Sequence, residues 1–196
     1  SKYHKLITGT LADIGGFSLN YHKHINTGEG GVLVTNDDEY AMRLRLIRNH
    51  AEAVVGSAGI KNLSNMIGHN FRLGEIESAI GIEQLKKMHG LVDRRRELSE
   101  RLTKNISGLT GLRPPIIRAG CTHSYYMYPM VLDTKLLGVP RAVLFDALVA
   151  EGVQGLSCGY VNVHLLPMYQ QKMAYGSNGF PWSSEICKRE VDYSKG

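Results

Sequence analysis

The chain has 196 residues, of which 43% are hydrophobic and 21% are charged. This composition is typical of a soluble globular protein with one large core or two small ones, and it argues against intrinsic disorder. Lysine and arginine total 23 against 18 acidic residues, and the resulting net charge of +5 is spread over several segments. The run Arg94-Arg95-Arg96 is denser, and we interpret it as the solvated face of a helix rather than a nucleic-acid site.

The sequence disfavours several other classes of protein. No apolar run approaches the roughly 20 residues that a membrane helix needs. The three cysteines form no Cys-x-x-Cys motif, which predicts neither a disulfide framework nor a metal site; they are Cys121, Cys158 and Cys187. Free thiols favour a reducing cytoplasm. The sequence shows no initiator methionine, secretory signal or helix-ending pattern at its close, so we interpret it as an internal fragment.

Two short apolar runs bordered by glycine, residues 14–18 and 31–35, predict buried strands on either side of a loop. Lys23 lies in this loop. Residues 36–38 offer helix caps before a pattern of apolar residues interleaved with arginines, which predicts an amphipathic helix that ends at about His50.

The next region predicts a loop followed by two helical segments. Residues 51–66 contain glycine and serine and indicate a loop. From residue 73 onward, apolar and small residues recur at helical intervals, which predicts a buried helix that ends near Gly90. Residues 91–106 carry charge on most faces and predict an exposed helix that connects two domains.

The last third of the chain predicts a small α/β domain. Residues 123–132 are rich in aromatic and branched side chains, which favours a strand. Pro140 is suited to open a helix over residues 141–151, and Gly152 is suited to end it. We place the domain boundary near Arg94, which gives a first domain over residues 1–93 and a second over residues 94–196.

Lys23 is the candidate catalytic residue. A lysine amine bonds to a carbonyl carbon only when it is unprotonated, and burial or nearby positive charge favours that form. Lys23 lies between two apolar strands, beside His22 and His24, and before a glycine-rich turn over residues 27–31 that permits close backbone approach. Composition alone still favours an ordinary surface lysine.

The sequence around Lys23 resembles the lysine motif of the DegT/DnrJ/EryC1/StrS sugar aminotransferases. The matching residues there are Gly9-Thr10, Asp13-Ile14-Gly15, Phe17-Ser18, Lys23 and Thr27-Gly28-Glu29-Gly30-Gly31. The resemblance covers essentially the whole chain, through Arg48-Asn49-His50, Gly68-His69-Asn70-Phe71-Arg72, Ala79-Ile80-Gly81, Gln84-Leu85, Tyr125-Tyr126, Gly152-Val153, Leu166-Pro167-Met168-Tyr169-Gln170 and Tyr193-Ser194-Lys195-Gly196.

This resemblance implies the α/β fold of a transferase dependent on pyridoxal phosphate (PLP), in the aspartate-aminotransferase-like fold type I. The chain would hold part of the large domain and a small C-terminal α/β domain. Lys23 would bind PLP as a Schiff base, and the Ser18 hydroxyl would contact the cofactor phosphate. Asn70 would reach that phosphate from the other subunit of a homodimer, although Phe71 replaces the tyrosine of the family motif.

The same resemblance implies transfer of an amino group from glutamate to a keto sugar. The sugar would be linked to a nucleotide or used in a surface polysaccharide. His22, Arg72, His123 and Tyr126 are candidate substrate contacts.

Each of these roles has a structural alternative. Ser18 could simply end a strand, Asn70 could cap the helix expected to begin near Arg72, and Arg72 could be an ion-pair partner. His22 and His24 fit packing or hydrogen-bonding roles better than the role of catalytic base, because a lysine can itself move the proton. Glu29 fits a role in ordering the glycine turn, and His123 and Tyr126 are the less specific candidates for the pocket.

Members of the family are longer than this chain. The part that the chain lacks would supply the aspartate that pairs with the pyridine nitrogen, the ring that stacks on the cofactor and a helix N-terminus for its phosphate. We therefore expect the chain alone to be inactive, and its unmatched apolar face to cause aggregation unless another copy or the missing half covers it.

Two other functions remain open from the sequence. A PLP-dependent sugar dehydratase of the same scaffold would have histidine where Lys23 stands, so Lys23 favours the transferase. The chain could also be a truncated relative that serves only as a dimerisation module.

Overall fold

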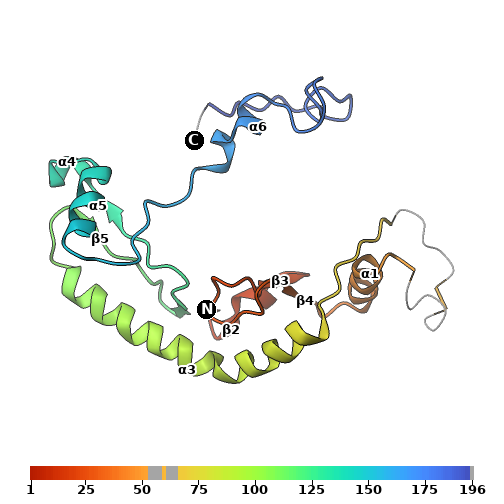
Figure 1. The fold of residues 1–196 in the computed structure, drawn as a ribbon, viewed down its shortest axis with the longest axis horizontal. Helices are drawn as coiled ribbons and strands as arrows, with labels where there is room; N and C mark the ends of the chain where they lie inside the picture. The colour runs from red at the N-terminus through yellow and green to blue at the C-terminus, as the bar shows by residue number, and fades with distance from the viewer. Residues whose placement is uncertain (53–58, 61–65, 195–196) are drawn as a thin grey trace. The chain divides into compact units, whose positions relative to one another are not determined.

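The computed structural model describes residues 1–52, 59–60 and 66–194 (Figure 1). They form two compact units, Ser1–Leu136 and Leu137–Gly196, and each unit is described by itself. The loop expected over residues 51–66 lies largely outside the described residues.

The β-structure of the first unit consists of short antiparallel strands. A three-stranded sheet has the order β2, β1, β6, which correspond to Leu6–Ile7, Lys2–Tyr3 and Cys121–Thr122. A separate pair joins β5 (Leu112–Arg113) to β7 (Val131–Leu132). One 3-10 turn, η1, covers Thr8–Thr10. Through β1 and β6, the N-terminal residues hold the segment that follows residue 120.

A hairpin presents the loop that contains Lys23. Strand β3 (Gly15–Ser18) pairs with β4 (Gly31–Val34) in a register that places Ser18 opposite Gly31. The two predicted strands are therefore confirmed in position, and residues 19–30 form the connection. Their predicted burial is wrong, because most residues of both strands are exposed.

Helix α1 (Asp38–Arg48) confirms the predicted amphipathic helix. The carboxylate of Asp37 accepts a hydrogen bond from Tyr40 N at 2.9 Å, which satisfies one of the free amides at the helix start. Acidic residues occupy the first turn and arginines the last, an arrangement that complements the helix dipole.

Helix α3 (Glu75–Ile106) is one continuous helix of 32 residues, about 48 Å long at 1.5 Å per residue (Figure 1). The predicted end near Gly90 is wrong. A single glycine costs about 1 kcal/mol relative to alanine, and the strong helix formers on both sides outweigh that cost. The predicted burial of its first half is also wrong, since Ile76 and Ile82 are 76% and 60% exposed.

The strand expected over residues 123–132 forms only at its end. Strand β6 stops at Thr122, and β7 begins at Val131. Between them Tyr125 adopts a positive φ of 52°, which a strand cannot contain. Contacts with α3 and with the loop that contains Lys23 therefore override the strand propensity of this segment.

Short helices occupy the junction of the units and the second unit. They are α4 (Thr134–Leu137), α5 (Arg141–Ala150), η2 (Val163–Leu165) and α6 (Pro167–Gln170). The helix predicted after Pro140 is thus confirmed, and Gly152 follows it with a φ of +86°. The predicted domain boundary at residues 93 and 94 falls inside α3, whereas the compact units divide after Leu136. The boundary at Arg94 stays a prediction.

The buried core of the described residues is small. Its hydrophobic members are Leu19, Leu46, Ala51 and Tyr125. Large apolar side chains of β3, β4 and α3 face solvent instead. No helix among the described residues has the length and apolarity needed to cross a membrane.

We expect the 196-residue chain, prepared by itself, to self-associate, because many large apolar side chains are exposed and their burial favours contact between copies. Sedimentation velocity over a concentration series should show species heavier than the monomer. The change Ile76→Lys should reduce this association, whereas Lys87→Ala, which adds no charge to an apolar position, should not. A monomer at every concentration, with a sharp cooperative unfolding transition, would contradict the expectation.

Candidate functional site

The hairpin loop over residues 19–30 is closed at its base by backbone hydrogen bonds. Leu19 N donates to Gly30 O, and Thr27 N donates to Leu19 O, each at 2.9 Å. Thr27 is only 5% exposed, and its hydroxyl donates to Glu29 O at 2.7 Å. A Cβ on Gly30 would lie 2.9 Å from both the Thr27 hydroxyl oxygen and a methyl carbon of Leu73, so glycine is required there.

Asn20 organises the part of the loop that leads to Lys23. Its side-chain amide donates to Glu29 Oε1 at 2.7 Å, and its own amide N donates to Ser18 Oγ at 3.2 Å. Asn20 Oδ1 accepts from His22 N at 3.1 Å, and Asn20 O accepts from Lys23 N at 2.9 Å. These contacts support the interpretation that Glu29 orders the turn. The sequence analysis missed Asn20, although asparagine in a loop commonly bonds to nearby backbone amides.

Two contacts join the Lys23 loop to residues that lie about one hundred positions later in the chain. Lys23 is half-buried, and its Nζ lies 3.8 Å from the centroid of the Tyr126 ring, a cation–π contact. His24 Nε2 lies 2.7 Å from Ser124 O. Because a carbonyl only accepts, Nε2 of His24 must carry the hydrogen. The structure thus brings together two of the predicted site residues, Lys23 and Tyr126.

The environment of His24 favours its neutral form. Burial disfavours the charged imidazolium and lowers the pKa of His24 below its ordinary value of 6.5. The hydrogen bond to the Ser124 carbonyl opposes this shift, while the positive charge of Arg95 adds to it. His24 therefore acts as a neutral hydrogen-bond donor at this contact.

The segment Gly68–Arg72 lies against the end of α1. Asn70 forms an isolated antiparallel bridge with Asn49, and His69 N donates to Ile47 O at 2.8 Å. Arg72 Nη1 donates to Asn49 Oδ1 at 2.9 Å. The alternative that Asn70 caps the next helix is wrong, because α3 begins later, after Gly74 at its N-cap position. In the described part of the chain, no hydrogen bond joins Asn70 or Arg72 to Lys23.

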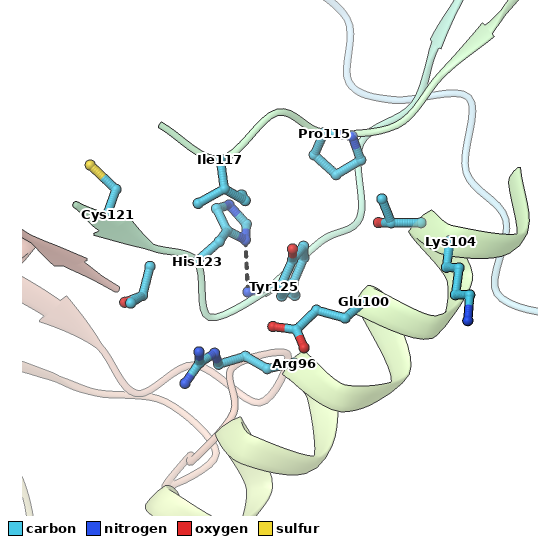
Figure 2. A pocket seen from close by; sticks show the side chains of 10 residues that line it. Arg96, Glu100, Lys104, Pro115, Ile117, Cys121, His123 and Tyr125 are labelled. Atoms are coloured by element: carbon cyan, nitrogen blue, oxygen red, sulfur yellow. Dashed lines mark hydrogen bonds between the residues drawn. The ribbon is translucent and has the colours of Figure 1, made fainter. Parts of the chain in front are cut away.

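The other predicted residues have local partners. His22 packs on Tyr21 with ring centroids 3.7 Å apart and is exposed. His123 Nδ1 accepts from Tyr125 N at 2.9 Å. His123 also lines a cavity of about 430 Å³ beside α3, together with Arg96 and Glu100 (Figure 2). The described residues contain no cluster of side chains suited to a metal ion.

Arg95 is a further residue that the sequence analysis missed. Its Nη1 donates to Tyr125 O at 3.2 Å and to Tyr126 O at 3.3 Å. In the sequence Arg95 lies four residues before Ser99 and eight before Thr103, so the three share one face of the helix, but no sequence signal distinguishes Arg95 from Arg94 and Arg96. Arg95 is an exposed residue of α3, so the predicted solvated helix face is confirmed for it, and its guanidinium additionally contacts the turn.

Comparison with known protein sequences shows a match along nearly the whole chain. The model of the DegT/DnrJ/EryC1/StrS aminotransferase family matches residues 1–193. The spore coat polysaccharide biosynthesis protein SpsC of Bacillus subtilis is 28% identical over 195 residues, which cover 96% of this chain and 50% of SpsC.

Solved structures show the same relationship. PseC of Helicobacter pylori, an aminotransferase involved in the biosynthesis of pseudoaminic acid, has a TM-score of 0.72 at 28% identity, over 91% of this chain and 47% of PseC. The GDP-4-keto-6-deoxy-D-mannose-3-dehydratase of E. coli, solved with bound hydrated PLP, has a TM-score of 0.68 at 27% identity, over 78% of this chain and 42% of the dehydratase.

These likenesses confirm the predicted α/β fold of type I, of which the chain holds a part. The chain spans about half the length of the relatives it matches. With the family model matching almost every residue, the chain belongs to the DegT/DnrJ/EryC1/StrS aminotransferase family.

Proposed function

We propose that Lys23 anchors PLP and that the protein uses this cofactor to move an amino group from glutamate to a keto sugar. The observation that carries the proposal is the setting of the Lys23 amine. It is held half-buried by a closed loop, against an aromatic ring, and no carboxylate pairs with it among the described residues. An amine without an acidic partner is available to bond to an aldehyde.

The residues around Lys23 fit the cofactor. Ser18 Oγ accepts a hydrogen bond from Asn20 N, which leaves the hydroxyl hydrogen of Ser18 available for a phosphate oxygen. Ser18 is exposed, so an anion can reach it. A Cβ at Gly28 would find no atom within 4 Å, and the turn therefore leaves open space beside the backbone. The hydroxyl of Ser18 and the open position at Gly28 are therefore compatible with an anionic cofactor at this loop.

PLP, when bound, supplies an aldehyde that bonds to amines and a ring that accepts electron density from the substrate carbon. Lys23 provides the amine that holds the cofactor. With its amine free, Lys23 would be the group able to accept a proton from the substrate carbon and to donate a proton again, so that one side chain would serve as both base and acid. His24 donates to the Ser124 carbonyl, which supports its role as a structural residue rather than a base.

The exposed position of Asn70 supports a site shared between two copies of the chain. Its backbone is fixed by the bridge to Asn49, and its side chain faces solvent. We assign the Asn70 amide to the phosphate of the cofactor bound to the second copy, in a homodimer. Arg72, anchored by Asn49, would place a positive charge beside it for a carboxylate or a diphosphate of the substrate.

The class of sugar follows from the relatives. SpsC is named for the biosynthesis of spore coat polysaccharide, and the name of the E. coli dehydratase gives a keto sugar linked to GDP as its substrate. We therefore propose a nucleotide-linked keto sugar as acceptor, with His22 and His123 as further candidates for contacts to it. The free thiols of the three cysteines fit a cytoplasmic enzyme.

A sugar dehydratase is the second candidate, since the chain resembles the E. coli 3-dehydratase. The family pattern places histidine at the anchoring position in dehydratases. This chain has Lys23 there, and the neighbouring His24 is already engaged with Ser124. Both features favour the transferase.

We expect Lys23→Ala to abolish turnover in the full-length protein, because no other amine is presented from this loop. The wild-type protein with PLP should show a visible absorbance band that shifts when glutamate is added, and the variant should show no such band. Lys86→Ala, which changes an exposed lysine of α3 paired with Glu83, is the matched control and should behave as wild type.

The same measurement separates the alternatives. A dehydratase would consume the keto sugar without a net gain of nitrogen in the product, which mass spectrometry of the sugar detects. A protein that serves only as a dimerisation module would give no absorbance band with PLP. A band that survives Lys23→Ala would overturn the assignment of the anchoring lysine.

We expect the pH dependence of stability to report the neutral state of His24. The pKa of His24 is lowered in the folded protein. Below about pH 6.5, His24 is therefore protonated more readily in the unfolded chain than in the folded chain. The contribution of neutral His24 to the free energy of unfolding is thus fully present above that pH and is lost as the pH is lowered. The variant His24→Gln keeps a donor for Ser124 O but cannot titrate, and its urea midpoint should fall less between pH 7 and pH 5. An equal fall of the urea midpoint in the wild-type protein and in His24→Gln would contradict this interpretation.

A further inference from the structure

The turn at Ser124–Tyr126 carries an unusual backbone. Tyr125 has a φ of +52°, in the left-handed region that bulky side chains rarely adopt. Such conformations persist only where the surroundings hold them, and they cluster at functional sites. Here the turn presents two groups to the Lys23 loop, the carbonyl of Ser124 and the ring of Tyr126.

One set of contacts fixes the Tyr125 side of the turn. The ring of Tyr125 is only 8% exposed and stacks on Tyr128 with centroids 5.9 Å apart. Tyr128 in turn shares a hydrogen bond of 2.6 Å with Thr103 on α3. His123 Nδ1 accepts the Tyr125 amide hydrogen at 2.9 Å, and Figure 2 shows this bond beside α3. These contacts account for the position of Tyr125. They do not restrain Tyr126, the next residue of the turn.

Arg95 supplies the remaining restraint. Its guanidinium donates to the carbonyls of both Tyr125 and Tyr126. Its neighbours in the run bond to acidic residues of their own helix, Arg94 to Glu97 and Arg96 to Asp93. Arg95 differs from them, because its partners lie in the turn. Helix α3 thereby restrains the backbone of the turn from which the Tyr126 ring projects.

The ring of Tyr126 is a chemically suitable partner for an amine that must later react. An aromatic face attracts an ammonium group without a formal negative charge. A carboxylate would hold the charged form much more strongly and would oppose its release. The Lys23 amine lies 3.8 Å from the ring centroid, so the ring holds the amine in place without the stronger attraction of an ion pair.

We propose that Tyr126 and Arg95 are positioning residues for Lys23. The Tyr126 ring holds the amine at the cofactor site, and Arg95 holds the ring by fixing the turn. When the cofactor arrives, Nζ forms a bond to the aldehyde carbon, the aldehyde oxygen leaves as water, and the ammonium proton passes to solvent. This inference rests on the proposed function of Lys23, and it gives Tyr126 a role other than the substrate contact expected from the sequence.

The test measures the reactivity of the Lys23 amine in the full-length protein without PLP. Limited acetylation with acetic anhydride, read by peptide mass spectrometry, gives the rate at Lys23 relative to exposed Lys86 as an internal reference. We expect Tyr126→Leu to raise the relative rate at Lys23 about two- to fivefold, the size of a cation–π contact at a partly exposed site. Tyr126→Phe keeps the ring and should restore the wild-type rate.

Arg95→Gln tests the second half of the proposal and should raise the Lys23 rate in the same direction, without any change to the ring. Arg94→Gln is the matched control and should leave the rate unchanged, because the contact of Arg94 within the described residues is with Glu97 on its own helix. If Tyr126→Leu unfolds the protein, Arg95→Gln and Tyr126→Phe still test the positioning roles. If the ring were purely structural, the acetylation rate at Lys23 would not depend on Arg95.

The outcomes separate this inference from the proposed function. Unchanged relative rates in Tyr126→Leu and Arg95→Gln, in a protein whose PLP band depends on Lys23, would overturn the positioning roles alone. A protein in which PLP binding does not depend on Lys23 would overturn the proposed function. In that case a raised acetylation rate would still establish the contact but not its purpose.

Discussion

The geometry of the site depends on the packing of Thr27 between the hairpin and the start of α3. Thr27 is buried, closes the loop through its amide and hydroxyl, and lies so near α3 that a Cβ at Gly81 would be 3.2 Å from its methyl carbon. Gly30 is required on the other side by the same crowding. Small residues at two distant positions thus let a strand connection pack against a helix. Because this junction is closed, Lys23 projects from a fixed loop.

A second set of contacts joins the Lys23 loop to the segment that contains Ser124 and Tyr126. The β1–β6 pairing brings the segment after residue 120 back toward the N-terminal residues, and Ser124 and Tyr126 then meet His24 and Lys23. Residues far apart in the sequence therefore define the surroundings of the amine. A change in α3 that moves Arg95 is expected to alter the surroundings of Lys23, because Arg95 donates to the backbone carbonyls of the turn that carries Tyr126.

The elements predicted correctly from the sequence are those that local residue patterns encode. Glycine-bordered apolar runs located the hairpin, the Asp37 cap located α1, and Pro140 located α5. The errors have physical causes. Gly90 does not end α3, because its neighbours are strong helix formers. Residues 123–130 do not form a strand, because long-range contacts impose the left-handed turn at Tyr125.

The candidate site was predicted only in part. The family motif predicts Lys23 and Ser18, and their roles stay predictions, whereas the contact of Arg95 with the turn could not be predicted because the three arginines of the run look alike in sequence. Only tertiary structure shows that two of the three bond within their helix and that the third bonds to the turn. The burial of α3 and of the hairpin was overestimated, because such patterns report apolar faces and not whether a partner covers them.

The most direct test of the account identifies the residue that holds PLP. Reduction of the PLP-loaded protein with borohydride, followed by digestion and peptide mass spectrometry, locates the attached pyridoxyl group. The account predicts the group on Lys23, in the peptide that continues into the glycine turn. A group found on another lysine, or on none, would contradict it.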